Sequence, residues 1–155
     1  MTTRARLPSE TATAGIACDA RGQAITVCCV DRPDAARIDL LAQRVRAELG
    51  ASPSRIPRAA VLRALLLVGL ETAEPGGLAL PHLGYFAVRY QYVVTAKELD
   101  RLERFRSARW SLVVRPPPER LQGALVRRGL EHAEYREHFA REVLSSRLPR
   151  AKVQP

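Results

Sequence analysis

The chain has 155 residues and a net charge of +9, with 25 Lys and Arg against 16 Asp and Glu. Its hydrophobic content of 46% is enough to fold without disulfides or metals, which excludes a disordered protein. The apolar run from Val61 to Leu70 is interrupted by Arg63 and has about half the length of a membrane span. The first residues lack the apolar stretch of a secretion signal, so we expect a cytoplasmic protein.

The first residues predict a flexible arm, a strand and a helix, in that order. Residues 1–22 are small, polar or Pro without periodicity, which is typical of an arm. Residues 24–30 are rich in β-branched side chains and predict a strand. Asp34 is a suitable N-cap for the helix that follows, and Gly50 is a suitable end. Apolar side chains recur between them at helical spacing: Ile38, Leu41, Ala42, Val45 and Leu49.

A second helix is predicted over residues 57–74. Pro57 fits its first turn, because the amide that Pro lacks would have no helical partner there. This helix is apolar on nearly all sides and therefore needs several neighbours to cover it. Residues 75–84 contain Pro and Gly and predict a linker to the second half of the chain.

The second half repeats this order. Residues 86–94 predict a strand, and Thr95 is a suitable cap for a helix with Leu99, Leu102 and Phe105 on its core face. Three prolines, 116–118, interrupt the chain before a helix over 118–134. Residues 135–155 predict a C-terminal extension, with an amphipathic helical pattern followed by a basic tail.

An internal repeat connects the two halves. Residues 59–74 return as 119–134, with seven of sixteen pairs identical, among them Gly69/Gly129 and Leu65/Leu125. The first helices also align, with a shift of one residue that a loop insertion would explain. We therefore predict two strand-helix-helix units, 23–74 and 85–134, the alternative being two unrelated amphipathic helices.

The order strand, helix, turn, helix resembles the ribbon-helix-helix superfamily of DNA-binding proteins. The likeness lies in Ser54-Arg55-Ile56-Pro57-Arg58-Ala59-Ala60-Val61-Leu62-Arg63-Ala64-Leu65, which looks like the start of that family's second helix. It covers residues 24–74 well and 86–134 more loosely. The resemblance implies an α+β, mostly helical chain in which two tandem units form a pseudodimer: a two-stranded antiparallel ribbon plus four or five helices.

In that family the ribbon enters the major groove, and the N-terminus of the second helix holds a phosphate. Alternation along residues 86–94 predicts an apolar face of Phe86, Val88, Tyr90, Tyr92 and Val94. In the first strand, Ile25, Val27 and Cys29 are expected inside, which places Val30 outside. The base-reading residues predicted on this basis are Arg89, Gln91, Val93, Thr26 and Cys28, and the phosphate-binding ones are Arg55, Arg58, Ala59 and Arg115.

Two positions depart from the family pattern. Pro57 stands where a capping hydroxyl is expected, and prolines 116–118 remove amides that would hold a phosphate in the second unit. The charge is also uneven, with +2 over residues 1–84 and +7 over 85–155. A net excess of this kind favours a polyanionic partner.

The predicted function is sequence-specific binding of double-stranded DNA by a cytoplasmic, nucleoid-associated protein. A transcriptional repressor, an antitoxin or an accessory factor of plasmid transfer fits this description, either as a monomeric pseudodimer or as a homodimer of it. The alternative is a protein-interaction module that binds a toxin or another partner through residues 135–148. The sequence has no Gly-rich phosphate loop, nucleophile elbow or metal-ligand spacing, so we predict no cofactor, no metal and no enzymatic activity.

Overall fold

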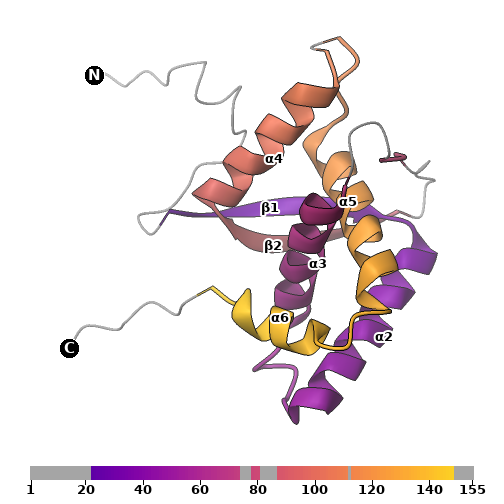
Figure 1. The fold of residues 1–155 in the computed structure, drawn as a ribbon, viewed down its shortest axis with the longest axis vertical. Coiled ribbons are helices and arrows are strands. Elements are labelled where there is room, and N and C mark those ends of the chain that lie inside the picture. Colours follow the sequence, from indigo (N-terminus) through magenta and orange to yellow (C-terminus); the bar gives the residue numbers. More distant parts are fainter. Residues whose placement is uncertain (1–21, 74–77, 81–86, 112, 149–155) are drawn as a thin grey trace.

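The computed structural model of the chain describes residues 22–73, 78–80, 87–111 and 113–148. The predicted arm, most of the predicted linker, Phe86 and the basic tail therefore lie outside the described residues. The described part is α+β and mostly helical, as predicted (Figure 1). Its elements in chain order are β1 (Gln23–Val30), α2 (Arg32–Leu49), α3 (Arg58–Thr72), β2 (Val88–Thr95), α4 (Ala96–Arg109), α5 (Pro118–Ala133) and α6 (Phe139–Ser145).

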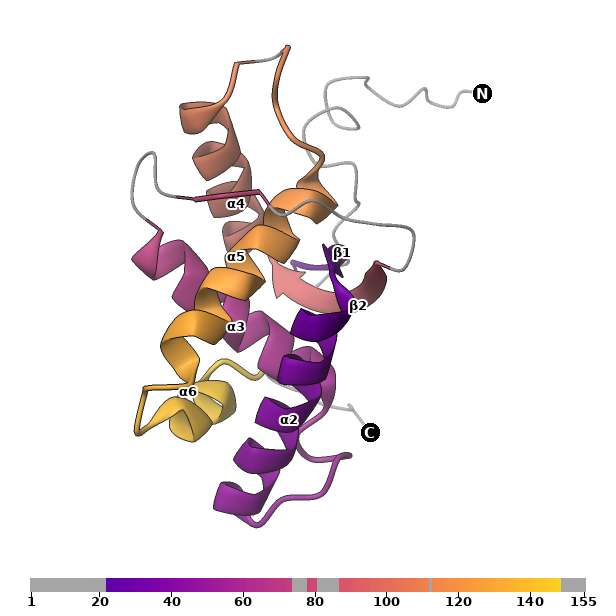
Figure 2. The ribbon, with the colours of Figure 1, turned by 90° about the vertical axis from the view of Figure 1, so that its right-hand side faces the viewer.

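The two strands form an antiparallel ribbon. Val27 lies opposite Gln91 near its centre, and the pairing runs from Gln23 with Thr95 to Val30 with Val88. Helices α3 and α5 lie side by side over one face of the ribbon, while α4 and α6 lie toward opposite ends of the molecule (Figures 1 and 2). Within the described ranges, no helix combines the length and apolar content that a membrane span needs.

The N-cap of helix α2 lies three residues before the predicted cap, Asp34. Asp31 is its N-cap, because the Asp31 carboxylate accepts a hydrogen bond from the Asp34 amide at 2.9 Å. Asp34 itself lies inside the first turn, where burial raises its pKa although Arg127 and Arg37 lower it. Gly50 ends the helix as predicted, with φ of 58° in the left-handed region that glycine adopts without strain.

The two units differ in the length of their first helix. Helix α2 has 18 residues and α4 has 14, whereas eight residues, 50–57 and 110–117, separate the first from the second helix in both units. Alignment from the caps Asp31 and Thr95 matches Ile38 with Leu102, and both are buried. The expected one-residue shift from a loop insertion is therefore wrong: unit two lacks about one helical turn of its first helix.

Helices α3 and α5 contact each other through equivalent residues of the repeat. A Cβ atom added to Gly69 would lie 2.0 Å from the Leu125 carbonyl oxygen, and one added to Gly129 would lie 2.1 Å from that of Leu65. The repeat pairs Gly69 with Gly129 and Leu65 with Leu125. Each unit therefore presents to the other the same backbone contact, as the two sides of a two-fold interface do.

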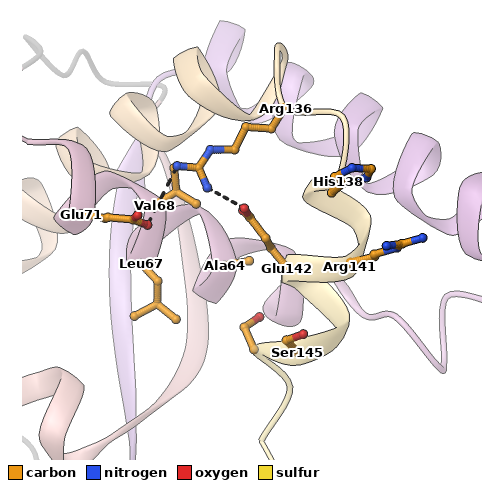
Figure 3. Close-up of a pocket in the computed structure, with 10 residues that line it drawn as sticks. Ala64, Leu67, Val68, Glu71, Arg136, His138, Arg141, Glu142 and Ser145 are labelled. Atoms are coloured by element: carbon orange, nitrogen blue, oxygen red, sulfur yellow. Dashed lines mark hydrogen bonds and ion pairs between the residues drawn. The ribbon is translucent and has the colours of Figure 1, made fainter.

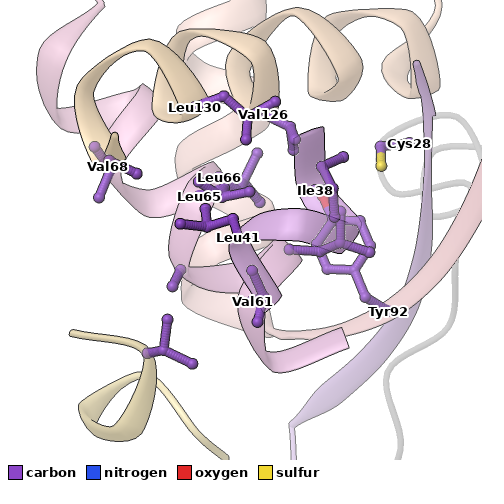
Figure 4. Packing of buried hydrophobic residues seen from close by; sticks show 14 of the residues in the cluster. Cys28, Ile38, Leu41, Val61, Leu65, Leu66, Val68, Tyr92, Val126 and Leu130 are labelled. Atoms are coloured by element: carbon purple, nitrogen blue, oxygen red, sulfur yellow. The ribbon is translucent and has the colours of Figure 1, made fainter. Parts of the chain in front are cut away.

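Helix α3 occupies the centre of the core, as its apolar sequence predicts. Its side chains meet Ile38 and Leu41 of α2, Tyr92 of the ribbon, and Val126 and Leu130 of α5 (Figure 4). Helix α3 is thus covered by elements from both halves of the chain. One strand-helix-helix unit alone would leave part of its apolar surface exposed. The buried α3 side chains are Val61, Leu62, Ala64, Leu65, Leu66, Val68 and Leu70.

Three buried polar side chains connect the ribbon to α5. The Tyr92 hydroxyl donates to Gln122 Oε1, and Gln122 Nε2 donates to Thr26 Oγ1 at 2.8 Å. Burial raises the pKa of Tyr92 well above its usual range, so the hydroxyl stays protonated and can donate. The network joins residues of both units, and Leu62 stands at the position of unit one that corresponds to Gln122.

We expect Gln122→Leu to lower the free energy of unfolding by about 1–3 kcal/mol, because it leaves the Tyr92 and Thr26 hydroxyls buried without their partner. Urea unfolding followed by circular dichroism measures this loss. The triple variant Thr26→Val, Tyr92→Phe, Gln122→Leu is the control, since it removes every polar member and should recover part of the stability. A triple variant less stable than the single one would contradict this role of the network.

Candidate nucleic-acid interface

Strand β2 has the predicted orientation. Tyr92 and Val94 are buried against the helices, whereas Arg89 and Gln91 are exposed and Val93 is half-buried on the opposite face. A strand alternates its side chains between two faces, so Arg89, Gln91 and Val93 share the face that points away from the helices. Two long polar side chains therefore stand on alternate positions of an exposed ribbon.

Strand β1 has the opposite orientation to the one predicted. Thr26 and Cys28 have only 2% and 0% of their surface exposed, so neither lies on the outward face, and Val30 is buried as well. The outward residues are Ile25, Val27 and Cys29. The physical reason is that the Gln122 amide satisfies the buried Thr26 hydroxyl, which lets a polar residue take a core position that hydrophobicity assigns to Ile25.

The outward face changes character from one end to the other. At one end Ile25, which is 59% exposed, lies opposite Val93. At the other end Arg89 lies opposite Cys29. The face therefore has an apolar pair near one end and a charged residue near the other, with the polar pair of Gln23 and Thr95 beyond the apolar one.

Glu119 holds the guanidinium of Arg89. The Arg89 Nη2 atom lies 2.8 Å from Glu119 Oε2, in the first turn of α5. The pair borders Cys29, whose pKa is raised by burial and by Glu119 and lowered by Arg89. Sequence reasoning missed Glu119, because nothing in the order of residues brings it to Arg89 until β2 pairs with β1 and α5 packs on β1.

If the outward face binds an anion, Glu119 opposes it. We expect Glu119→Gln to tighten duplex DNA binding by about tenfold or less, since it removes one negative charge and releases Arg89. Fluorescence anisotropy with a labelled duplex at low salt measures the change. Glu131→Gln is the matched control, because Glu131 is exposed and lies twelve residues farther along α5, about 18 Å away. Equal changes in both variants would show only the effect of net charge.

The N-terminus of α3 lies beside the ribbon and borders a cavity of about 460 Å³. The Arg58 guanidinium donates to Asp39 at 2.8 Å and lies 5.1 Å from the centre of the Tyr90 ring. Burial raises the pKa of Tyr90, and the Asp39 carboxylate raises it further. The cavity brings together two predicted phosphate-binding residues and two predicted base readers, and its lining is Val27, Arg58, Ala59, Leu62, Arg89, Tyr90 and Gln91.

The other two predicted phosphate-binding residues do not line this cavity. Arg55 is exposed in the turn before α3, where its amide donates to the Ser52 carbonyl at 3.0 Å. Arg115 is largely buried, and its guanidinium lies 3.6 Å from Glu103 and 3.5 Å from the Trp110 carbonyl oxygen. We infer that Arg115 holds the connection between α4 and α5.

The N-terminus of α5 differs chemically from that of α3. Pro117 is its cap and Pro118 its first residue, so neither provides an amide donor. The Glu119 carboxylate adds negative charge to the same turn. A phosphate is therefore disfavoured at this helix, because its first turn lacks two amide donors and carries a carboxylate.

A second cavity, of about 500 Å³, lies between α3 and α6 (Figure 3). Arg136 crosses it, with its guanidinium 2.5 Å from Glu142 and 3.9 Å from Glu71. Two residues of the predicted partner-binding segment 135–148, Phe139 and Val143, are buried in the core of this protein. They are therefore unavailable to a partner. The large apolar side chains of this segment that remain exposed are Tyr135 and Leu144.

The described ranges contain no cluster of three or more His, Cys, Asp or Glu that could hold a metal ion. Comparison of the chain with protein-family models, with curated proteins and with solved structures found no match.

Proposed function

We propose that this protein is a tandem ribbon-helix-helix protein that binds double-stranded DNA in a sequence-specific manner through the outward face of its ribbon. The antiparallel pairing of β1 with β2 and the reciprocal glycine contacts of α3 and α5 support a pseudodimer formed by one chain. The observation that carries the proposal is the placement of exposed Arg89 and Gln91 on one ribbon face, beside the N-terminus of α3.

The chemistry of these side chains suits base edges in the major groove. Arg can donate two hydrogen bonds to O6 and N7 of guanine, and Gln can bond to N6 and N7 of adenine. The major groove is about 12 Å wide and admits a two-stranded ribbon. The net charge of +9 favours the phosphate backbone through counterion release.

Within this function, the protein acts without enzymatic chemistry as a transcriptional repressor, an antitoxin or an accessory factor of plasmid transfer in the cytoplasm, associated with the nucleoid. The second candidate is a protein-interaction module with weak or no DNA binding. The observation that favours it is the cavity between α3 and α6, next to a segment with the exposed apolar side chains of Tyr135 and Leu144.

Duplex binding across a range of salt concentrations tests the proposal. We expect saturable binding of a random-sequence duplex at low salt, with an affinity that falls linearly with salt on logarithmic axes. Selection from the same random pool should then enrich a defined sequence. Mass measurement in solution should give a monomer that binds, and absence of duplex binding even at low salt would favour the interaction module.

A further inference from the structure

We propose that the DNA site of this protein is asymmetric, with thymine methyl groups contacted by Ile25 and Val93 at one end and a guanine contacted by Arg89 at the other. This inference rests on the proposed function and adds to it the bases that the ribbon selects. It follows from the composition of the outward face, on which the pair of Ile25 and Val93 is apolar whereas Arg89 is charged.

Ile25 and Val93 form an apolar pair near one end of the ribbon, next to the terminal pair of Gln23 and Thr95, whose Thr95 hydroxyl caps α4. Ile25 and Val93 lie directly opposite each other, and Ile25 is 59% exposed. An Ile in this position cannot read a base by hydrogen bonds. It can bury the C5 methyl group of thymine, the apolar group that base pairs present in the major groove.

The charged end has the complementary chemistry. Arg89 is exposed, and its guanidinium can donate to a base edge in place of Glu119. The residue opposite Arg89 is Cys29, which is buried and short, so it offers no rival contact. Arg89 therefore determines the preference at this end, and guanine is the base that accepts two hydrogen bonds from Arg.

The spacing between the two contacts follows from strand geometry. Residues 25 and 29 of one strand are four positions apart, which corresponds to about 13 Å along the ribbon. Base pairs follow one another at about 3.4 Å, so the thymine and guanine contacts should be separated by about four base pairs. Val27 and Gln91 lie between them and contact the intervening bases.

Base substitution in the selected duplex tests this assignment. A random-sequence duplex pool is selected with the full chain, and each thymine of the enriched duplex is replaced in turn by deoxyuridine, which lacks only the methyl group. We expect the loss of affinity to be about three- to fivefold per contacted methyl group, the effect of one methyl group no longer buried. The sensitive thymines should lie about four base pairs from a guanine whose replacement by 7-deazaguanine also weakens binding.

The variant Ile25→Ala should lose part of the preference for thymine over deoxyuridine, and the double variant Ile25→Ala, Val93→Ala should bind the two duplexes equally. Leu40→Ala is its control, because Leu40 is an exposed apolar residue of α2 and its variant should keep the preference for thymine. The test on the wild-type chain is informative even if Ile25→Ala does not fold.

Three outcomes overturn the inference. An enriched palindrome, or deoxyuridine without effect at every position, would contradict the asymmetric site while leaving duplex binding intact. No saturable binding of any duplex at low salt would contradict the proposed function, and with it this inference. Loss of the thymine preference in Leu40→Ala as well would assign that preference to something other than the ribbon.

Discussion

A chain with both Arg89→Ala and Gln91→Ala should bind its selected duplex about a hundredfold more weakly, while its affinity for random duplex should change by less than tenfold. Each bidentate contact contributes about 1–3 kcal/mol of discrimination between bases, so two together account for this loss. Nonspecific affinity depends on phosphate contacts, to which these exposed side chains contribute at most one charge. Anisotropy titrations with the two duplexes measure both constants.

The matched control is Arg104→Ala, which removes the same charge from the exposed surface of α4, where Arg104 pairs with Asp100. It should lower the affinity for both duplexes by the same small factor. Equal losses for selected and random duplex in the double variant would assign Arg89 and Gln91 to the phosphates. No change in either constant would remove the ribbon face from the interface.

The face of β2 could be predicted from the sequence, whereas the face of β1 could not. In β2 the polar residues Arg89 and Gln91 alternate with aromatic and β-branched residues, so only one orientation buries the apolar set. In β1 both alternating sets are apolar or small, and hydrophobicity places Ile25 inside. The decisive partner is Gln122, which is 96 residues from Thr26 in the sequence. Its buried hydrogen bond to Thr26 favours the orientation of β1 in which Thr26 is inside and Ile25 is outside.

The site could be predicted only in part for a similar reason. Alternation places Arg89 on the outward face, but its ion pair with Glu119 depends on how β1, β2 and α5 pack together. Arg115 is the opposite case. It is predicted to bind phosphate, whereas its guanidinium lies beside Glu103 and the Trp110 carbonyl oxygen inside this protein. The position of a charged residue in the sequence therefore does not predict which group it contacts in the folded protein.

The close approach of α3 and α5 makes a single methyl group at Gly69 strongly destabilising. We expect Gly69→Ala to lower the free energy of unfolding by about 3 kcal/mol or more, although Ala usually favours a helix over Gly by about 1 kcal/mol. The added Cβ would lie 2.0 Å from the Leu125 carbonyl oxygen, which belongs to the backbone and cannot move without displacing α5. Gly129→Ala should have a similar effect, because it meets the Leu65 carbonyl oxygen at 2.1 Å.

Gly50→Ala is the control for both variants, since it adds the same methyl group where no atom lies within 4 Å. Its cost should be about 1 kcal/mol, from the left-handed backbone at φ of 58° alone. Urea unfolding of the three variants distinguishes the two effects. Stabilisation by Gly69→Ala would show that helix propensity outweighs the contact, and would contradict the packing of α3 on α5 from which the pairing of the two units is inferred.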